Sequence, residues 1–374
     1  MKWSLRLGSI AGIGIFMHWS FVLIIAWIVS VLLFQGHDLP VVADGVLFVF
    51  AIFGCIVLHE LGHALTARRY GIGTRDITLL PIGGVARLER MPEKPQEELR
   101  VAIAGPAVNV LIFGILYGFL WLFGGLKPFA AIEWIGGNWA DFLLRLMWFN
   151  LFIVAFNLLP AFPMDGGRVL RSILAHRLDF VRATEVASRV GQGMAFLFGF
   201  IGLLVLNPFL ILIAVFVYFG AQAENHSTHM TAVIRGLLVK DAMMSRFRCL
   251  SEDDTLDVAV RELLAGSQHE FPVWRDGRIV GLLTRSNLVE ALAERGRSAL
   301  VGTAMQADYP TVEETAALEE VFQMMSQGRL SVMPVVNAEG DPVGLLTAEN
   351  VGELVMVSSA IKQRQREASA DRAI

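Results

Sequence analysis

The chain has 374 residues, of which 55% are hydrophobic and only 18% are charged. Soluble globular domains carry about 25% charged residues, so this composition, with a mean hydropathy of +0.56, indicates a membrane protein. The formal net charge of -4 argues against a nucleic-acid partner, which needs a basic surface. The two cysteines, Cys55 and Cys249, lie far apart in different kinds of sequence, so no disulfide framework is implied.

Apolar segments fill the first 223 residues and predict a polytopic α-helical membrane protein with about six transmembrane helices. The predicted spans are 16–35, 45–66, 101–123, 142–163, 190–206 and 208–223. The first four are long enough to cross ~30 Å of hydrocarbon, which takes about 20 helical residues. The basic and then apolar N-terminus reads as a retained first span rather than a cleaved signal peptide. The last two segments flank Pro208, so they are two short helices or one kinked helix, giving six or five spans.

The distribution of Lys and Arg predicts the orientation of these helices. Segments 1–15, 67–100 and 164–189 together carry fourteen such residues, and segments 36–44 and 124–146 carry two. By the positive-inside rule the first group lies in the cytoplasm. We therefore expect a multi-pass plasma-membrane protein, and we favour six spans, which place the C-terminal region in the cytoplasm.

The second predicted span contains the sequence VLHELGHAL, residues 57–65. On a helix, His59 and His63 share one face, so both imidazoles can bind one metal ion. Glu60 lies beside the first histidine and can act as a base toward water at that metal, as in the H-E-x-x-H pattern. This pattern also occurs by chance, but three ionisable groups within a membrane helix are costly, and such groups are usually functional.

A zinc site of this kind needs a third protein ligand. Asp165 in the sequence NLLPAFPMDGG, residues 157–167, is the best candidate, because it directly follows the fourth span. Pro160 and Pro163 predict irregular backbone there. The alternative is an exposed aspartate at a helix end.

These motifs resemble the site-2 protease family of intramembrane zinc metalloproteases. The resemblance covers about residues 1–223 and extends to GPAVN at 105–109 and LLPIGGVARLE at 79–89. It implies one Zn²⁺ per chain held by His59, His63 and Asp165, with Glu60 as the catalytic base. It also implies that Asn157 orients substrate or stabilises an oxyanion. Asn157 and Asn109 can equally be hydrogen-bonding links between helices, and for Asn109 we prefer that structural role.

The segment at residues 76–89 is rich in β-forming residues around a pair of glycines. It predicts either an exposed strand edge, to which an unwound substrate adds as a further strand, or an ordinary surface hairpin. If the edge binds substrate, a proline at Leu79 should abolish cleavage and leave zinc bound.

The C-terminal region contains an internal repeat with ordinary soluble composition. Thr284 and Thr347 lie 63 residues apart, as do Asn287 and Asn350, and each copy reads as strand, turn, strand and helix. The expected domains are 1–223 for the membrane part, 224–236 as a linker, 237–295 and 299–357 for the two copies, and 358–374 as a flexible tail.

The two copies resemble a pair of CBS domains, which are α/β modules. The resemblance implies an adenine nucleotide at Thr284, Asn287, Thr347 and Asn350, and a homodimer formed through these domains. In the family an Asp follows the Thr or Ser by three residues, whereas both copies here have Asn. A structural or dimerising role without nucleotide is the alternative.

These observations lead to an intramembrane zinc metalloprotease that cleaves a peptide bond within or next to a transmembrane helix of a substrate protein. The CBS pair is expected to modulate it. A CBS-regulated transporter or channel is the alternative, because intramembrane His and acidic residues also mark ion pathways. A catalytically inactive scaffold is disfavoured, because His59, Glu60 and His63 are all present.

Overall fold

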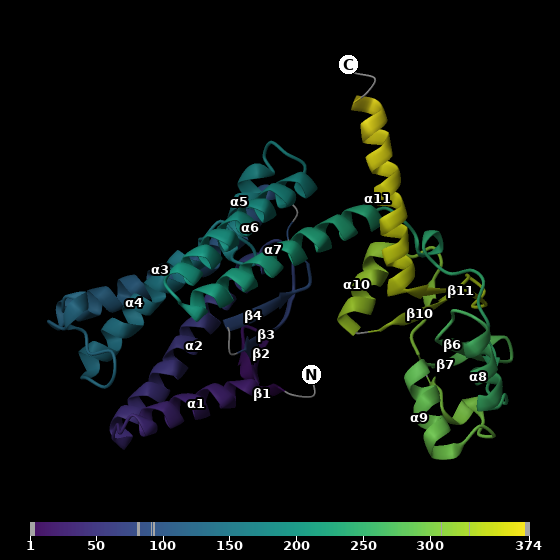
Figure 1. The fold of residues 1–374 in the computed structure, drawn as a ribbon, viewed down its shortest axis with the longest axis horizontal. Coiled ribbons are helices and arrows are strands. Elements are labelled where there is room, and N and C mark those ends of the chain that lie inside the picture. Colours follow the sequence, from purple (N-terminus) through teal and green to yellow (C-terminus); the bar gives the residue numbers. More distant parts are fainter. Residues whose placement is uncertain are drawn as a thin grey trace. The chain divides into compact units, whose positions relative to one another are not determined.

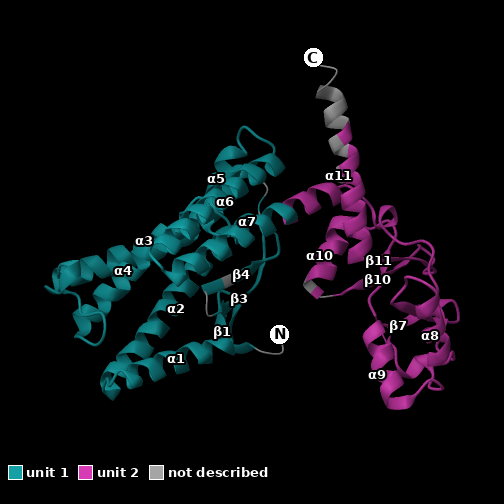
Figure 2. Ribbon diagram, in the orientation of Figure 1, with its two compact units in different colours: residues 1–226 teal, residues 227–374 magenta. Residues whose placement is uncertain are grey.

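The computed structural model describes residues 4–80, 83–90, 92, 94–307, 309–328 and 330–370. The chain forms two compact units, residues 1–226 and 227–374 (Figure 2). The segment 224–236, expected to be a linker, is largely helical, because helix α7 (Pro208–Ile234) continues through it. Its residues 224–234 contain neither Pro nor Gly, so nothing in the local sequence ends the helix.

The first unit is dominated by helices (Figure 1), most of which are apolar. They are α1 (Ser20–Phe34), α2 (Leu39–Arg68), α3 (Pro95–Leu122), α4 (Trp139–Asn157), α5 (Asp165–Leu174), α6 (Phe180–Leu204) and α7, with a 3₁₀ helix at Phe129–Ala131. Within the described residues, α2, α3, α4, α6 and α7 are the five that are long and apolar enough to cross a membrane, and α1 is apolar but has 15 residues. The prediction of a polytopic helical membrane region is confirmed.

Two separate helices, and not one kinked helix, occupy the last apolar region. Helix α6 ends at Leu204, and Leu206 has a positive φ of 50°. The side chain of Asn207 then accepts hydrogen bonds from the backbone N–H groups of Phe209 and Leu210, at 3.0 and 3.3 Å. Pro208 begins α7. Asparagine before a helix and proline at its first position are common start signals, so local sequence explains this break.

A four-stranded sheet also belongs to this unit and was not predicted in full. Its strands are β1 (Ser4–Ile10), β2 (Ile13–His18), β3 (Thr74–Leu80) and β4 (Gly83–Leu88), in the order β1-β2-β3-β4. Strands β2 and β3 are parallel, and the other pairs are antiparallel. The expected first span, 16–35, therefore begins too early. Residues 4–18 form a hairpin whose two-residue turn, Ala11-Gly12, has φ of 53° and 84°, as a tight hairpin turn requires.

Most of the segment 76–89 lies in β3 and β4, which pair with each other, and β4 is an edge strand. Residues 81–82 of this segment lie outside the described residues. Leu79 lies in β3, which pairs with β2 on one side and β4 on the other. A proline at Leu79 would thus disrupt the interior of the sheet and does not test the edge. Strand β4 contacts helix α2.

Helices α2 and α3 approach each other closely. A Cβ on Gly62 of α2 would lie 2.7 Å from the backbone oxygen of Ala104 on α3. Small residues permit such close backbone approach in membrane helices. Helix α2, which carries two of the candidate ligands, is thereby held beside α3.

The second unit contains two similar α/β halves. The first has strands β5 (Leu250–Ser251), β6 (Phe271–Arg275), β7 (Arg278–Leu283) and β8 (Gln306–Ala307) with helices α8 (Leu256–Ala265) and α9 (Arg285–Arg295). The second has strands β9 (Val312–Glu313), β10 (Val332–Val336) and β11 (Pro342–Thr347) with helices α10 (Leu318–Gly328) and α11 (Ala348–Ala370). Short 3₁₀ helices occur at Val239–Asp241 and Val301–Thr303. The strand-turn-strand-helix reading of each copy is confirmed.

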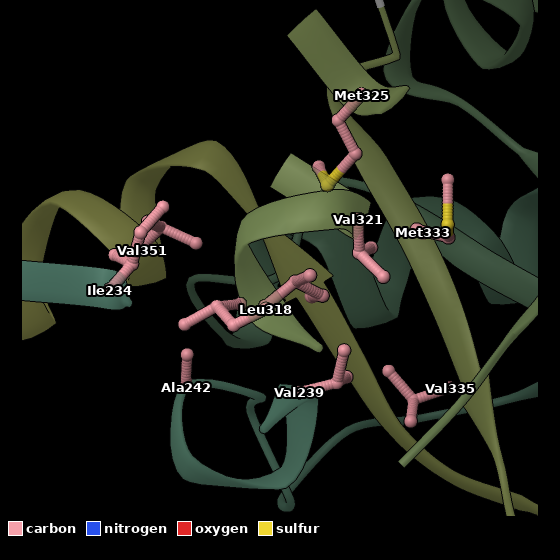
Figure 3. Close-up of a cluster of buried hydrophobic side chains, with 10 residues drawn as sticks. Ile234, Val239, Ala242, Leu318, Val321, Met325, Met333, Val335 and Val351 are labelled. Atoms are coloured by element: carbon pink, nitrogen blue, oxygen red, sulfur yellow. The ribbon is translucent and has the colours of Figure 1, made fainter. Parts of the chain in front are cut away.

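Each half has its own apolar core. In the second half, Leu318 and Val321 of α10 pack with Met333 and Val335 of β10 (Figure 3). Ile234, at the end of α7, joins this cluster and is 1% exposed. The sequence predicts a flexible tail at 358–374; helix α11 extends to Ala370, and residues 371–374 lie outside the described residues. The Lys, Gln, Arg, Glu and Ala residues of α11 are all good helix formers.

Candidate metal centre

Three buried side chains from two distant parts of the chain converge in the first unit. His59 and His63 lie one helical turn apart on α2, and Asp165 is the first residue of α5. The distances among His59 Nε2, His63 Nε2 and Asp165 Oδ2 are 3.1, 3.2 and 3.1 Å. The residues are only 5%, 5% and 7% exposed. The structure therefore brings together the three residues that the sequence singled out.

The outer nitrogens of both imidazole rings have fixed partners. His59 Nδ1 lies 2.5 Å from Asn109 Oδ1, and His63 Nδ1 lies 2.7 Å from the backbone oxygen of Val101. Both partners are acceptors, so each Nδ1 carries the proton and donates it. In a neutral imidazole the Nε2 atom is then an acceptor. Two nitrogen lone pairs and a carboxylate oxygen consequently face one another, an arrangement that a cation stabilises.

The donor set and its surroundings fit Zn²⁺. A tetrahedral ion with bonds of about 2.0 Å needs ligand atoms about 3.3 Å apart, close to the separations of 3.1–3.2 Å found here. Gly105 of α3 leaves room at this point, because a Cβ there would lie 2.2 Å from His63 Nε2 and 2.6 Å from His59 Nε2. Two imidazoles and one carboxylate form a three-ligand set typical of catalytic zinc.

Glu60 is half-buried beside the two histidines and lies against strand β4. Its Oε2 atom accepts a hydrogen bond of 3.1 Å from the backbone N–H of Ala86. Gly84 permits this approach, because a Cβ there would lie 2.9 Å from Glu60 Cγ and 2.8 Å from Ile56 Cγ2. One carboxylate oxygen of Glu60 is thus held at the edge strand.

Asp165 reaches the histidines because the chain folds back sharply after α4. Helix α4 ends at Asn157, and α5 begins at Asp165. The two glycines after Asp165 make this turn feasible. A Cβ on Gly166 would lie 2.2 Å from the backbone oxygen of Leu159, and one on Gly167 would lie 2.6 Å from the backbone nitrogen of Phe162. The backbone thus requires glycine at positions 166 and 167, directly after the aspartate that supplies the carboxylate.

A buried polar chain extends outward from His59. Asn109 Nδ2 donates to Asn150 Oδ1 at 2.7 Å, and Asn150 Nδ2 donates to the backbone oxygen of Leu146 at 2.8 Å and contacts Cys55 Sγ at 3.4 Å. Asn109 and Asn150 are both 0% exposed. Sequence reasoning treated Asn109 as a link between helices and missed Asn150. Asn109 does link α3 to α4, and it also orients a candidate ligand.

The remaining predicted site residues lie elsewhere. Asn157 is half-buried at the end of α4, and its side chain makes no hydrogen bond to any other residue in the described part of the chain. In the second unit, the Thr284 hydroxyl accepts from the backbone N–H of Asn287 at 3.2 Å. The Thr347 hydroxyl donates to Asn350 Oδ1 at 2.7 Å and accepts from its backbone N–H at 3.0 Å. Both threonines therefore cap helices.

The fold and this site define a class: a helical membrane protein with a two-histidine, one-carboxylate ligand set beside a glutamate. Residues 47–198 match the model of Peptidase family M50, and residues 239–294 and 301–355 match that of the CBS domain. The chain belongs to peptidase family M50, the site-2 proteases, and carries a CBS pair.

Two relatives support this assignment, and one similar solved structure is given beside them. The zinc metalloprotease MJ0392 of Methanocaldococcus jannaschii is 34% identical over 77% of this chain and 80% of its own length. Rip3 of Mycobacterium tuberculosis is 30% identical over 96% of this chain and 94% of its own. A solved site-2 protease from M. jannaschii is 37% identical, covers 60% of this chain and 95% of its own, and has a TM-score of 0.44. The protein is an intramembrane zinc metalloprotease, and the transporter alternative is not supported.

Proposed function

We propose that His59, His63 and Asp165 hold one Zn²⁺ per chain and that Glu60 is the catalytic base. The observation that carries this proposal is the set of three acceptor atoms, 3.1–3.2 Å apart. Both Nδ1 atoms are already committed to other acceptors. A bound zinc ion lowers the pKa of water and polarises a carbonyl group.

Glu60 and Asn157 then have separate roles in the reaction. Glu60 takes a proton from the attacking water and passes it to the leaving amine. The hydrogen bond from Ala86 to its Oε2 holds the carboxylate and leaves Oε1 for that proton. Asn157 would orient the substrate or donate to the oxyanion, and its half-buried amide is not used by the described residues.

The substrate is a transmembrane protein in the bilayer, and we infer that its unwound segment adds to the edge of β4. An edge strand offers unpaired backbone groups to an extended peptide. The backbone of Ala86 in this strand donates to Glu60. A peptide paired with β4 would therefore pass close to the proposed base.

We place the loops that contain residues 67–100 and 164–189 in the cytoplasm of a plasma-membrane protein. Their excess of Lys and Arg supports this orientation. If α1 crosses together with the five longer helices, the CBS pair is cytoplasmic too. Adding a protease from either side of sealed vesicles would test this by showing which side exposes residues of the second unit.

For the CBS pair we propose an adenine nucleotide contacted by Thr284, Asn287, Thr347 and Asn350, and a homodimer through these domains. The Asn350 carbonyl is already engaged by Thr347, so its amide N–H groups remain to donate to a ribose oxygen. Changing both asparagines to aspartate should tighten nucleotide binding, measured by calorimetry on the full-length protein. If neither the wild type nor the variant gives a heat of nucleotide binding, a structural role for the pair would be favoured.

The proposed catalytic roles are tested by two variants in the same cells. Glu60→Gln should keep zinc and lose cleavage, whereas Asp165→Ala should lose both. Comparison of membrane proteomes should reveal a substrate or truncated stub that accumulates with either variant. Full cleavage by Glu60→Gln, or full zinc content in Asp165→Ala, would overturn the assignment.

A further inference from the structure

The segment that delivers Asp165 to the histidines is covered by helix α7. Ala161 and Met164, which lie just before Asp165, share an apolar cluster with Val217 of α7. Phe162 shares another with Ala221 of α7. Four of these residues are at most 1% exposed, and Met164 is 4% exposed. One face of α7 therefore forms part of the support of this segment.

The closest approach is between a glycine and a proline ring. A Cβ on Gly220 of α7 would lie 2.5 Å from Pro163 Cδ and 2.9 Å from Pro163 Cγ. Pro163 precedes Asp165 by two residues, and its ring is bonded to the backbone, so it cannot rotate away as a long side chain would. A displacement of α7 toward Pro163 therefore presses on the backbone next to Asp165.

A buried ion network ties α7 to the helix that begins with Asp165. Arg171 of α5 donates to Glu98 Oε1 of α3 at 2.8 and 2.5 Å, and to Glu224 Oε1 of α7 at 2.6 Å. The side chains of Arg171 and Glu98 are only 1% and 2% exposed. The guanidinium also lies over the rings of Phe162 and Phe180, 5.0 and 4.7 Å from their centroids. This network fixes the position of α5 relative to α3 and α7.

Glu224 belongs to the same face of α7 as the apolar contacts. Positions 217, 220, 221 and 224 follow the three-to-four residue spacing of one helical face. Helix α7 then continues to Ile234, which is buried in the core of the second unit. The chain thus passes from the protease unit into the CBS unit through the helix that supports Asp165.

We propose that Gly220, Glu224 and Arg171 are positioning residues for Asp165, and that a displacement of α7 withdraws this carboxylate from the metal centre. This inference rests on the proposed role of Asp165 as a metal ligand. Because α7 continues into the CBS unit, a displacement of this helix is the route by which that unit would act on Asp165.

The test uses full-length protein in nanodiscs and two glycine variants. Gly220→Ala adds a methyl group against Pro163. Gly193→Ala on α6 is the matched control, because a Cβ at Gly193 meets nothing within 4 Å. Zinc affinity is measured by competition with a chelator, and the geometry of the site is measured from the visible spectrum of the Co²⁺-substituted protein. We expect Gly220→Ala to bind zinc at least about 10-fold more weakly, as when groups that orient metal ligands are lost, with a changed Co²⁺ spectrum. Gly193→Ala should match the wild type.

Glu224 provides a second test that adds no bulk. Glu224→Ala should also weaken zinc binding and change the Co²⁺ spectrum, and Glu224→Gln, which retains an acceptor for Arg171, should restore part of the loss. If Gly220→Ala fails to fold, this pair decides the question.

The outcomes separate the two proposals. If the wild type binds one zinc, Asp165→Ala loses it, and the folded α7 variants behave like the wild type, the positioning role of α7 is wrong and the ligand assignment stands. If Asp165→Ala keeps the zinc, the ligand assignment fails, and the positioning role fails with it.

Discussion

Gly105→Ala is a small change that should empty the candidate metal centre. Gly105 lies on α3, opposite the two histidines of α2, and an added Cβ would lie 2.2 Å from His63 Nε2 and 2.6 Å from His59 Nε2. Ordinary van der Waals contact begins at 3.4 Å. The rings must therefore move away by about 1 Å, whereas functional metal–ligand distances tolerate only about 0.2 Å.

The expected loss of zinc affinity follows from this displacement. A misplacement of about 1 Å can cost about 100-fold in a reacting geometry, and we expect at least a similar loss in zinc binding, about 2.8 kcal/mol. Helix propensity acts in the opposite direction, because alanine favours a helix interior over glycine by up to about 1 kcal/mol. The atoms that the variant displaces are the ends of side chains, so the variant should stay folded. It should nevertheless lose its metal.

The assay is zinc content per chain and chelator competition on purified protein, with thermal unfolding as the measure of fold. Gly114→Ala is the control on the same helix, because a Cβ there meets nothing within 4 Å. It should bind zinc like the wild type. Equal zinc affinity in Gly105→Ala and Gly114→Ala would refute the reasoning, because the imidazoles would not then face Gly105.

Three further outcomes are expected. Glu60→Gln should retain zinc and lower single-turnover cleavage by at least about 100-fold, the usual contribution of a general base; an unchanged rate would assign the base elsewhere. Asn109→Leu should weaken zinc binding about 10-fold to 100-fold, because His59 loses the acceptor for its Nδ1–H, whereas Asn157→Leu should leave zinc affinity unchanged and slow cleavage. Burial raises the pKa of the Glu270 carboxyl above its ordinary 4.5, so the folded state binds this proton more tightly than the unfolded state, and stability falls as the pH rises through the folded pKa. Glu270→Gln should remove that fall from thermal unfolding curves measured from pH 4.5 upward, and a pH profile identical to that of the wild type would contradict a raised pKa of Glu270.

The sequence predicted those parts of the site that depend on local spacing. His59 and His63 share a helix face whatever the tertiary fold, and the demand for a third ligand pointed to Asp165. The apolar helices and the CBS repeat could also be predicted, because long apolar segments and a 63-residue period are recognised without knowledge of the tertiary fold.

The missed parts depend on what lies opposite in space. Asn150 is an ordinary helical residue until α3 places Asn109 beside it. The partners of Arg171 come from positions 98 and 224, far apart in the chain, and no pattern links them. The hairpin at residues 4–18 had a usable signal, the alternation in SLRLGSI, but the apolar run that follows made the whole segment read as one span.

The surroundings of the glycines show close contacts between elements that the sequence patterns did not predict. The added Cβ of some glycines would meet nothing within 4 Å, which leaves them replaceable; these include Gly54, Gly114, Gly118 and Gly193. Others mark places where the centre is built by close approach, and at each of them a Cβ would meet an atom at less than 3.0 Å. These are Gly62, Gly84, Gly105, Gly166, Gly167 and Gly220. The second group surrounds the three candidate ligands and Glu60 from α2, β4, α3, α5 and α7. A centre assembled in this way depends on backbone spacing, so an element that moves by about 1 Å should displace the candidate ligands. Among these elements, α7 is the one that also enters the CBS unit.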